Sequence, residues 1–204
     1  NCAMVLRKIN INVPTLGDLK LPAILAELAM ERKGLILVIG MTGSGKSTTL
    51  AAMLDHRNKN SYGHILSIED PVEFVHKHQN CIVSQREVGV DTDCWQNAIK
   101  SALRQAPNVV LIGEIRDAEA MDYALQFAET GHLCVATIHA TNCIQAIERI
   151  VNLFPTEKQH QVFMNLSLNL KAIVGQRLIK LEAGKGRAPA MEILLNTSTI
   201  ADYI

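Results

Sequence analysis

The fold of this chain is decided by one stretch, Gly40-Met41-Thr42-Gly43-Ser44-Gly45-Lys46-Ser47, which has the form G-x-x-x-x-G-K-S. The apolar run at residues 35–39 precedes it and predicts a strand, and residues 48–54 after it suit a helix. In this strand–loop–helix context the glycines let the backbone curl so that several N–H groups face one anion. The helix N-terminus adds the positive end of its dipole. The stretch therefore predicts a phosphate-binding loop.

The residue types of this loop indicate which ligands it binds. Lys46 is expected to reach the β- and γ-phosphates of a nucleotide, and the Ser47 hydroxyl is expected to bind Mg²⁺. We therefore predict ATP and Mg²⁺ as ligands. The predicted nucleotide contacts are Thr42, Gly43, Ser44, Gly45, Lys46, Ser47 and Thr48. The alternative, a glycine-rich turn with a chance lysine, is disfavoured by the strand and the helix on either side.

The composition limits the class of protein. The 204 residues suffice for one domain with a full core, or for one domain plus an appendage. Hydrophobic residues make up 48%, and 20 basic residues balance 20 acidic ones. The resulting net charge of zero disfavours a dedicated nucleic-acid binder, so we expect no direct nucleic-acid contact.

Further features of the sequence bear on location. The longest apolar runs hold about five residues, whereas a membrane-spanning helix needs about 20. The N-terminus, Asn1-Cys2-Ala3-Met4, lacks the shape of a signal peptide. Five cysteines are scattered without a C-x-x-C pair, which argues against a zinc site or a disulfide framework. We therefore expect a cytoplasmic protein with reduced thiols.

Strands and helices alternate along the rest of the chain. Apolar runs predict strands at 65–68, 109–112 and 133–138, shorter strands at 177–181 and 190–195, and a small β excursion within 72–90. Helical spacing predicts helices from Pro22 to Lys33, ended by Gly34, and at 95–103, 118–130, 142–153 and 157–174, the last with Leu166, Leu168, Leu170 and Ile173 in the core. Strands that are buried on both faces favour an α/β fold with a mostly parallel sheet flanked by helices.

Polar or glycine residues follow four of the predicted apolar strands. They are Gly40, Glu69-Asp70, Gly113-Glu114 and His139. Ligands of such sheets bind beyond the carboxyl ends of the strands. If these strands are parallel neighbours, the four groups converge on one phosphate site.

Carboxylates are the first group of candidates for catalysis. Glu114 follows four apolar residues, the form of a Walker B strand, and would hold the Mg²⁺ shell directly or through water. Glu69, Asp70 and Glu73 form an acidic cluster, and any of them could polarise the attacking water.

Histidines and arginines are the second group of candidates. His132 and His139 bracket one strand, so about 20 Å separates them and only one can reach the phosphates. His139, at the carboxyl end, is the better candidate, and His132 is expected to serve packing or an interface. Candidate charge stabilisers, in cis or reaching a neighbouring subunit, are Arg104, Arg116 and Arg149, with Arg86 a weaker one.

Four motifs in order resemble one family, the secretion and type IV pilus ATPases. Ile68-Glu69-Asp70-Pro71-Val72-Glu73-Phe74 is similar to the "Asp box" of that family. Residues 104–107 (Arg-Gln-Ala-Pro) and 113–117 (Gly-Glu-Ile-Arg-Asp) resemble its Walker B segment. Residues 129–132 and 137–142 resemble its "His box". Together with the phosphate loop, these motifs extend the resemblance over nearly the whole chain from about residue 5.

Within this family the chain resembles the pilus retraction motors of the PilT/PilU branch, and residues 131–137 and 167–171 are closer to PilU. The resemblance implies a RecA-like domain in a homo-hexameric ring that hydrolyses ATP at subunit boundaries. It also implies that the ring lies at the cytoplasmic face of the inner membrane, where it acts on a pilus platform protein. By the same analogy, Glu73 is the catalytic carboxylate, Glu114 the Walker B residue and His139 a contact to the phosphates.

The chain also departs from the family pattern. The family's PAS-like N-terminal domain is missing, so residues 1–20 are expected to be a linker or edge strand from it. Residues 21–204 are then the ATPase domain, with its C-terminal helices truncated. Asn108 stands where an aspartate is usual. Residues 199–204 differ from the Ala-Ile-Arg-Asn-Leu-Ile stretch of PilT-type motors, which favours an accessory motor that works with a PilT-type partner.

Other functions stay open at this point. One is an ATPase for pilus assembly, type II secretion or DNA uptake. Another is an ATP-binding docking subunit without motor activity of its own, although the complete Walker A and B set argues against it. A DNA translocase is disfavoured by the neutral charge, because such a protein needs a basic footprint.

Overall fold

The computed structural model describes residues 9, 12–182 and 186–204. In this part of the chain seven strands form one sheet in the order β3-β2-β4-β5-β1-β6-β7. The strands are β1 (Gly34–Ile39), β2 (Gly63–Glu69), β3 (Cys81–Glu87), β4 (Val109–Ile112), β5 (Leu133–Ile138), β6 (Leu170–Lys180) and β7 (Arg187–Leu195). The helices are α1 (Ile24–Ala29), α2 (Lys46–Asn60), α3 (Trp95–Leu103), α4 (Ala118–Glu129), α5 (Cys143–Asn152), α6 (Thr156–Asn169) and α7 (Ser198–Tyr203).

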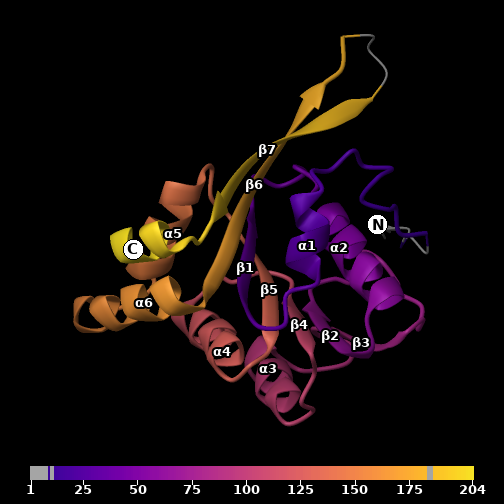
Figure 1. Cartoon of the computed structure of the whole chain (residues 1–204). Helices are drawn as coiled ribbons and strands as arrows, with labels where there is room; N and C mark the ends of the chain where they lie inside the picture. The colour runs from indigo at the N-terminus through magenta and orange to yellow at the C-terminus, as the bar shows by residue number, and fades with distance from the viewer. Residues whose placement is uncertain (1–8, 10–11, 183–185) are drawn as a thin grey trace, which may run out of the picture.

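Every neighbouring pair of strands is parallel except β6 and β7, which pair antiparallel. The predicted α/β fold with a mostly parallel sheet is therefore confirmed. Figure 1 shows the β6–β7 hairpin extending away from the body of the sheet.

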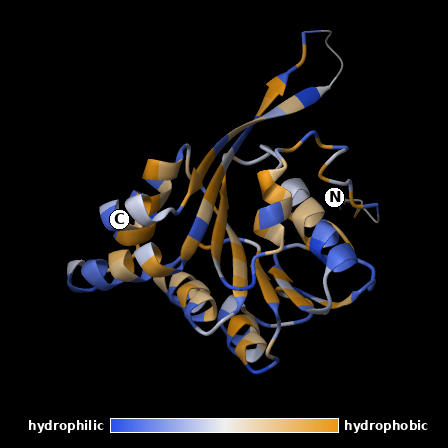
Figure 2. Cartoon of the chain, in the orientation of Figure 1, coloured by the Kyte–Doolittle hydropathy of each residue, from blue (hydrophilic) through white to orange (hydrophobic). Residues whose placement is uncertain are grey.

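The central strands of the sheet are buried on both faces, and strand β1 shows how. Alternate residues of a strand point to opposite faces. Leu35, Leu37 and Ile39 join a core cluster with residues of α3, α4, α5 and α6, whereas Ile36 and Val38 join a second cluster with α1 and α2. Figure 2 accordingly shows the central strands as mostly hydrophobic. Each such fully buried side chain contributes about 1.5–3 kcal/mol to folding.

The sequence interpretation of residues 72–90 was wrong in one respect. Residues Cys81–Glu87 do not form a separate excursion but strand β3, the edge strand of the main sheet, parallel to β2. The connection between β2 and β3, residues 70–80, contains no helix. We call this connection the crossover. Without a helix between them, two parallel strands are hard to recognise from sequence.

The end of the predicted helix at 157–174 was also wrong. Helix α6 stops at Asn169, and Leu170 begins β6, a central strand between β1 and β7. Leu166, Leu170 and Ile173 are buried as expected, but Leu168 is 75% exposed. The spacing of Leu166, Leu170 and Ile173 suits a helix. Leu170 and Ile173 instead reach one core cluster from the same face of β6, because a register shift in the pairing of β6 with β1 lies between them.

The N-terminal part of the chain differs in detail from the prediction. Helix α1 ends at Ala29, and Gly34 is the first residue of β1 rather than the stop of a helix. Arg57 of α2, which is buried, donates to the carbonyls of Ala29 and Glu31 and so ties the end of α1 to α2. Most of the strand expected within residues 1–20 lies outside the described residues, and residues 12–20 form bends and turns. Among the helices described, none is long and apolar enough to cross a membrane.

Candidate functional site

The carboxyl ends of β1, β2, β4 and β5 meet at one edge of the sheet, because these four strands are parallel and β2, β4, β5 and β1 are consecutive in the sheet. A cleft of about 500 Å³ opens there. Its lining includes Gly43, Gly45, Lys46, Ser47, Thr48, Glu69, Asp70, Glu73, Gly113, Glu114, Arg116, Thr137 and His139. The convergence that the strand ends predict is therefore present.

The phosphate loop, residues 40–47, has the backbone that an anion site needs. Gly43 and Gly45 have positive φ angles of 76° and 90°, which side chains with a Cβ atom rarely adopt. Gly45 precedes α2 and offers no side chain to cap it. The first-turn N–H groups of α2 therefore remain available to an anion, and a triphosphate fits this set of donors.

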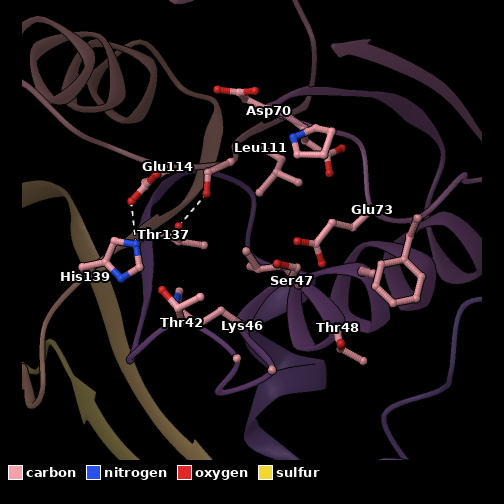
Figure 3. Close-up of a pocket in the computed structure, with 18 of the residues that line it drawn as sticks. Thr42, Lys46, Ser47, Thr48, Asp70, Glu73, Leu111, Glu114, Thr137 and His139 are labelled. Atoms are coloured by element: carbon pink, nitrogen blue, oxygen red, sulfur yellow. Dashed lines mark hydrogen bonds and ion pairs between the residues drawn. The ribbon is translucent and has the colours of Figure 1, made fainter. Parts of the chain in front are cut away.

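Lys46 lies in the same loop and is half-buried. Its Nζ donates to the carbonyls of Gly40, at 2.8 Å, and Met41, at 3.1 Å. Burial lowers the pKa of Lys46, while the negative charges of Glu114 and Glu73 oppose that shift. Figure 3 shows Lys46 and Ser47 at the floor of the cleft, with the Glu73 side chain extending toward Ser47.

Gln176 supports the phosphate loop from β6 and was not predicted from the sequence. Its side chain is 4% exposed, accepts a hydrogen bond from the Thr49 hydroxyl at 2.6 Å, and donates to the Ser44 carbonyl at 2.9 Å. A Cβ atom on Gly45 would lie 2.8 Å from Gln176 Nε2, so a glycine is needed beside it. The only signal in the sequence is a polar residue within a buried strand.

We expect Gln176→Met to destabilise the protein and to weaken nucleotide binding. The substitution keeps the length of the side chain but leaves the Thr49 hydroxyl and the Ser44 carbonyl without a buried partner, at about 1–3 kcal/mol for each group. Denaturant unfolding and titration with a fluorescent ATP analogue measure the two effects. Ile179→Gln is the control on the same strand, because Ile179 is 58% exposed. Unchanged stability and affinity in Gln176→Met would contradict this role.

Glu114 follows β4, and each of its two carboxylate oxygens contacts a basic side chain. Oε1 lies 2.7 Å from His139 Nε2, and Oε2 accepts from Arg116 Nε at 2.5 Å. Arg116 also reaches Asp70, with 3.6 Å between Nη1 and Oδ2. Each carboxylate oxygen has two lone pairs, so Glu114 can still accept from a metal-bound water. The structure thus brings Glu114, His139 and Arg116 together, as Figure 3 shows for the first two.

Thr137 of β5 holds the backbone on both sides of Glu114. Its hydroxyl donates to the Gly113 carbonyl at 2.5 Å, and its carbonyl accepts from the Ile115 N–H at 2.9 Å. Sequence reasoning missed this residue, because a threonine in an apolar strand has a common structural explanation. Thr137 precedes His139 by two residues, which is one period of a strand, and this spacing is the signal that places it at the cleft.

The carboxylates of the acidic cluster differ in exposure: Asp70 and Glu73 are exposed, whereas Glu69 is half-buried. Glu73 is exposed to solvent and lines the cleft. Glu69 is more enclosed, and its Oε1 accepts from Ser67 Oγ at 2.7 Å and Gln85 Nε2 at 3.2 Å. Burial raises the pKa of Glu69, and these hydrogen bonds oppose that shift. Of the two, Glu73 has the carboxylate that is open to an attacking water.

The remaining candidates lie farther from the cleft. Arg104 caps the end of α3, and Arg149 and Arg86 are exposed on other elements; none of the three lines the cleft. Arg187 at the start of β7 does line it, and no pattern in the sequence marks that arginine. Trp95, the first residue of α3, is partly buried and lines the same cleft.

Two residues lie at the opposite ends of their strands from the cleft. His132 precedes β5, contacts Thr130 through Nδ1 and packs edge-on against Phe127, which fits the packing role expected of it. Asn108 precedes β4, and its Oδ1 accepts from the His64 N–H at 2.8 Å. An aspartate could accept the same hydrogen bond, so the side-chain charge at this position is not needed for the contact.

No group of three or more His, Cys, Asp or Glu side chains within the described residues is arranged to hold a metal ion. A Mg²⁺ ion that binds together with a nucleotide does not need such a group of side chains, because it keeps several waters and takes phosphate oxygens as ligands. Ser47 and Glu114 both line the cleft and supply a hydroxyl and a carboxylate, which are ligands that suit Mg²⁺.

Known proteins have sequences similar to that of this chain. The family model "Type II/IV secretion system protein" matches residues 4–199. The type IV pilus ATPase PilU of Pseudomonas aeruginosa is 60% identical over 98% of this chain and 53% of its own length. The type IV pilus retraction ATPase PilT of the same organism is 46% identical over 98% of this chain and 58% of its own length. The chain thus spans a little over half the length of these relatives.

A solved structure extends the similarity to the fold. The crystal structure of the pilus retraction motor PilT with bound ADP superposes with a TM-score of 0.93 at 45% identity, over 96% of this chain and 57% of that one. The match in sequence and the match in fold cover the same elements that form the cleft. The chain therefore belongs to the type II/IV secretion system protein family, in its PilT/PilU branch.

Proposed function

We propose that this chain is the ATP-hydrolysing domain of a type IV pilus motor. The proposal is that residues 21–204 form the RecA-like ATPase domain of a homo-hexamer, and that residues 1–20 lead in from a PAS-like domain. The observation that carries it is the single cleft that brings Lys46, Glu73 and Glu114 together at the carboxyl edge of the sheet. The relatives, named as pilus ATPases, support the same assignment.

The proposed reaction is attack of water on the γ-phosphate of ATP. Lys46 and the first-turn amides of α2 bind the phosphates, and Glu73 accepts a hydrogen bond from the attacking water and orients it in line. Ser47 and Glu114 would hold Mg²⁺, which would neutralise part of the phosphate charge. His139, paired with Glu114, is placed to respond to the γ-phosphate.

The proposal assigns two arginines to the site, one from the same subunit and one from a neighbouring subunit. Arg116 acts within its own subunit, where it is already paired with Glu114 and Asp70. Arg104 is exposed, and in this proposal it supplies its charge in trans to the site of a neighbouring subunit. An arginine supplied in this way can be worth about 10³–10⁵ in rate. Loss of the γ-phosphate then changes these contacts and lets domains rotate.

We further propose that the motor drives pilus retraction as an accessory to a PilT-type ATPase, through an inner-membrane platform protein. Phosphate release by the full-length protein, with and without a PilT-type partner, tests this. We expect Mg²⁺-dependent turnover alone and a change in retraction when the gene is deleted. Absence of turnover both alone and with the partner would instead assign an ATP-binding docking subunit.

A further inference from the structure

Strand β3 changes from apolar to polar along one face as it approaches the cleft. Cys81 and Val83 are 3% and 8% exposed, and Gln85 and Glu87 continue the same face, because alternate residues of a strand point the same way. Ile82 and Arg86, on the other face, are exposed. Two polar side chains therefore point inward from an edge strand, yet neither lines the cleft.

Gln85 holds the crossover at two points. Its Oε1 accepts from the His76 N–H at 2.8 Å, and its Nε2 donates to the Phe74 carbonyl at 2.9 Å. A backbone N–H can only donate and a carbonyl can only accept, so these partners determine which end of the amide faces which. The same Nε2 donates to Glu69 Oε1 at 3.2 Å. One side chain thus links the crossover to the end of β2.

Glu87 holds the crossover on the other side of Glu73. Its Oε2 accepts from the Val72 N–H at 2.9 Å. Glu73 therefore lies between a residue bonded to Glu87 and a residue bonded to Gln85. Farther along, Asn58 of α2, which is 1% exposed, donates to the Lys77 carbonyl and accepts from the Gln79 and Cys81 N–H groups. These contacts leave the backbone around Glu73 little freedom.

We propose that Gln85 and Glu87 are positioning residues that hold Glu73 at the distance from the phosphate loop that in-line attack requires. The inference rests on the proposed role of Glu73. Neither side chain touches the nucleotide cleft, so both act through the backbone of the crossover. A misplacement of about 1 Å in a reacting group can cost about 10²-fold in rate. Binding of ATP depends on the phosphate loop and should be spared.

The first test compares four variants of the full-length protein. We expect Gln85→Met to lower kcat by about 10–100-fold, while the Kd for a fluorescent ATP analogue changes less than twofold. Ser84→Ala is the matched control, because it also removes one side-chain hydrogen bond of β3, to His64, without touching the crossover. Glu87→Gln keeps an oxygen that accepts from Val72 N–H and should retain kcat, whereas Glu87→Met should not. Equal kcat in wild type and Gln85→Met would overturn the proposal.

The second test is a double-mutant cycle with Glu73→Gln, measured by single turnover with labelled ATP. If Gln85 acts through Glu73, then Gln85→Met lowers the rate in the wild-type background and has no further effect in Glu73→Gln. An equal loss in both backgrounds would overturn the positioning role. Full turnover in Glu73→Gln alone would instead remove Glu73 from the mechanism, and that outcome is distinguishable because it does not involve Gln85. Thermal unfolding of each variant identifies any loss that comes from misfolding.

Discussion

Replacing Glu73 with glutamine is expected to lower ATP turnover by about 10²–10⁴-fold while leaving ATP affinity nearly unchanged. Glutamine keeps the shape of the side chain but cannot accept a proton from the attacking water. Glu73 is an exposed carboxylate of the acidic cluster, and its side chain extends toward Ser47 (Figure 3). Phosphate release and equilibrium binding of an ATP analogue, on the full-length protein, measure the two quantities.

The control for this variant is Glu119→Gln. Glu119 is an exposed acid in the first turn of α4, outside the cleft, so the same chemical change there should leave turnover within twofold. If Glu73→Gln turned over ATP as fast as the wild type, the role of orienting the water would pass to Asp70 or Glu69. Glu69 would then have to act while it accepts hydrogen bonds from Ser67 and Gln85.

Replacing Lys46 with alanine is expected to weaken ATP binding by about 10²–10⁴-fold. Lys46 supplies the one flexible cation within the phosphate loop, and hydrogen bonds to charged groups contribute about 1.5–3 kcal/mol each. Two such contacts to the β- and γ-phosphates correspond to that loss of affinity at about 1.4 kcal/mol per factor of ten. Isothermal titration with ATP and Mg²⁺ measures it directly.

Lys59→Ala provides the control for Lys46→Ala. Lys59 is on the same helix, and its Nζ lies 2.6 Å from Asp55 Oδ2 with the side chain 46% exposed, far along α2 from the phosphate loop. Such an exposed pair is worth little, so Lys59→Ala should bind ATP as the wild type does. An unchanged Kd in Lys46→Ala would mean that the amides of the loop hold the phosphates alone.

The two variants separate binding from chemistry, and the fold explains why they can. Lys46 begins α2 directly after β1, whereas Glu73 lies on the crossover between β2 and β3. Because different segments supply the binding group and the water-orienting group, each can be removed without moving the other. The contacts of Gln85 and Glu87 are made to the crossover, which carries Glu73, and not to the phosphate loop, which carries Lys46.

Much of the site could be predicted because its signals are local. Residues 40–47 are contiguous. Strand β1 ends directly before them, at Ile39, and helix α2 begins within them, at Lys46. The apolar runs that lead to Glu69, Gly113 and His139 were recognisable as strands. One general rule, that parallel strands present their carboxyl ends at one edge, then placed their polar ends together.

The missed residues depend on partners far away in the sequence. Gln176 is separated by 127 residues from Thr49 and by 132 from Ser44, so no window of sequence contains both partners. Gln85 gains its role only because β3 lies beside β2, and the crossover between them has no helix to indicate a parallel connection. Residues 170–174 have apolar spacing that suits helix and strand equally, and pairing with β1 decides for the strand.

The sequence by itself determined the phosphate loop, the alternation of strands and helices, and the rim at which the polar groups gather, since each follows from contiguous residues and the period of a strand or helix. The tertiary structure alone decided which side chains hold that rim in place. A hydrogen bond from β3 to the crossover, or from β6 to the phosphate loop, exists only once separate strands have paired. Its energy comes from enclosing both partners away from water, which no single segment can do.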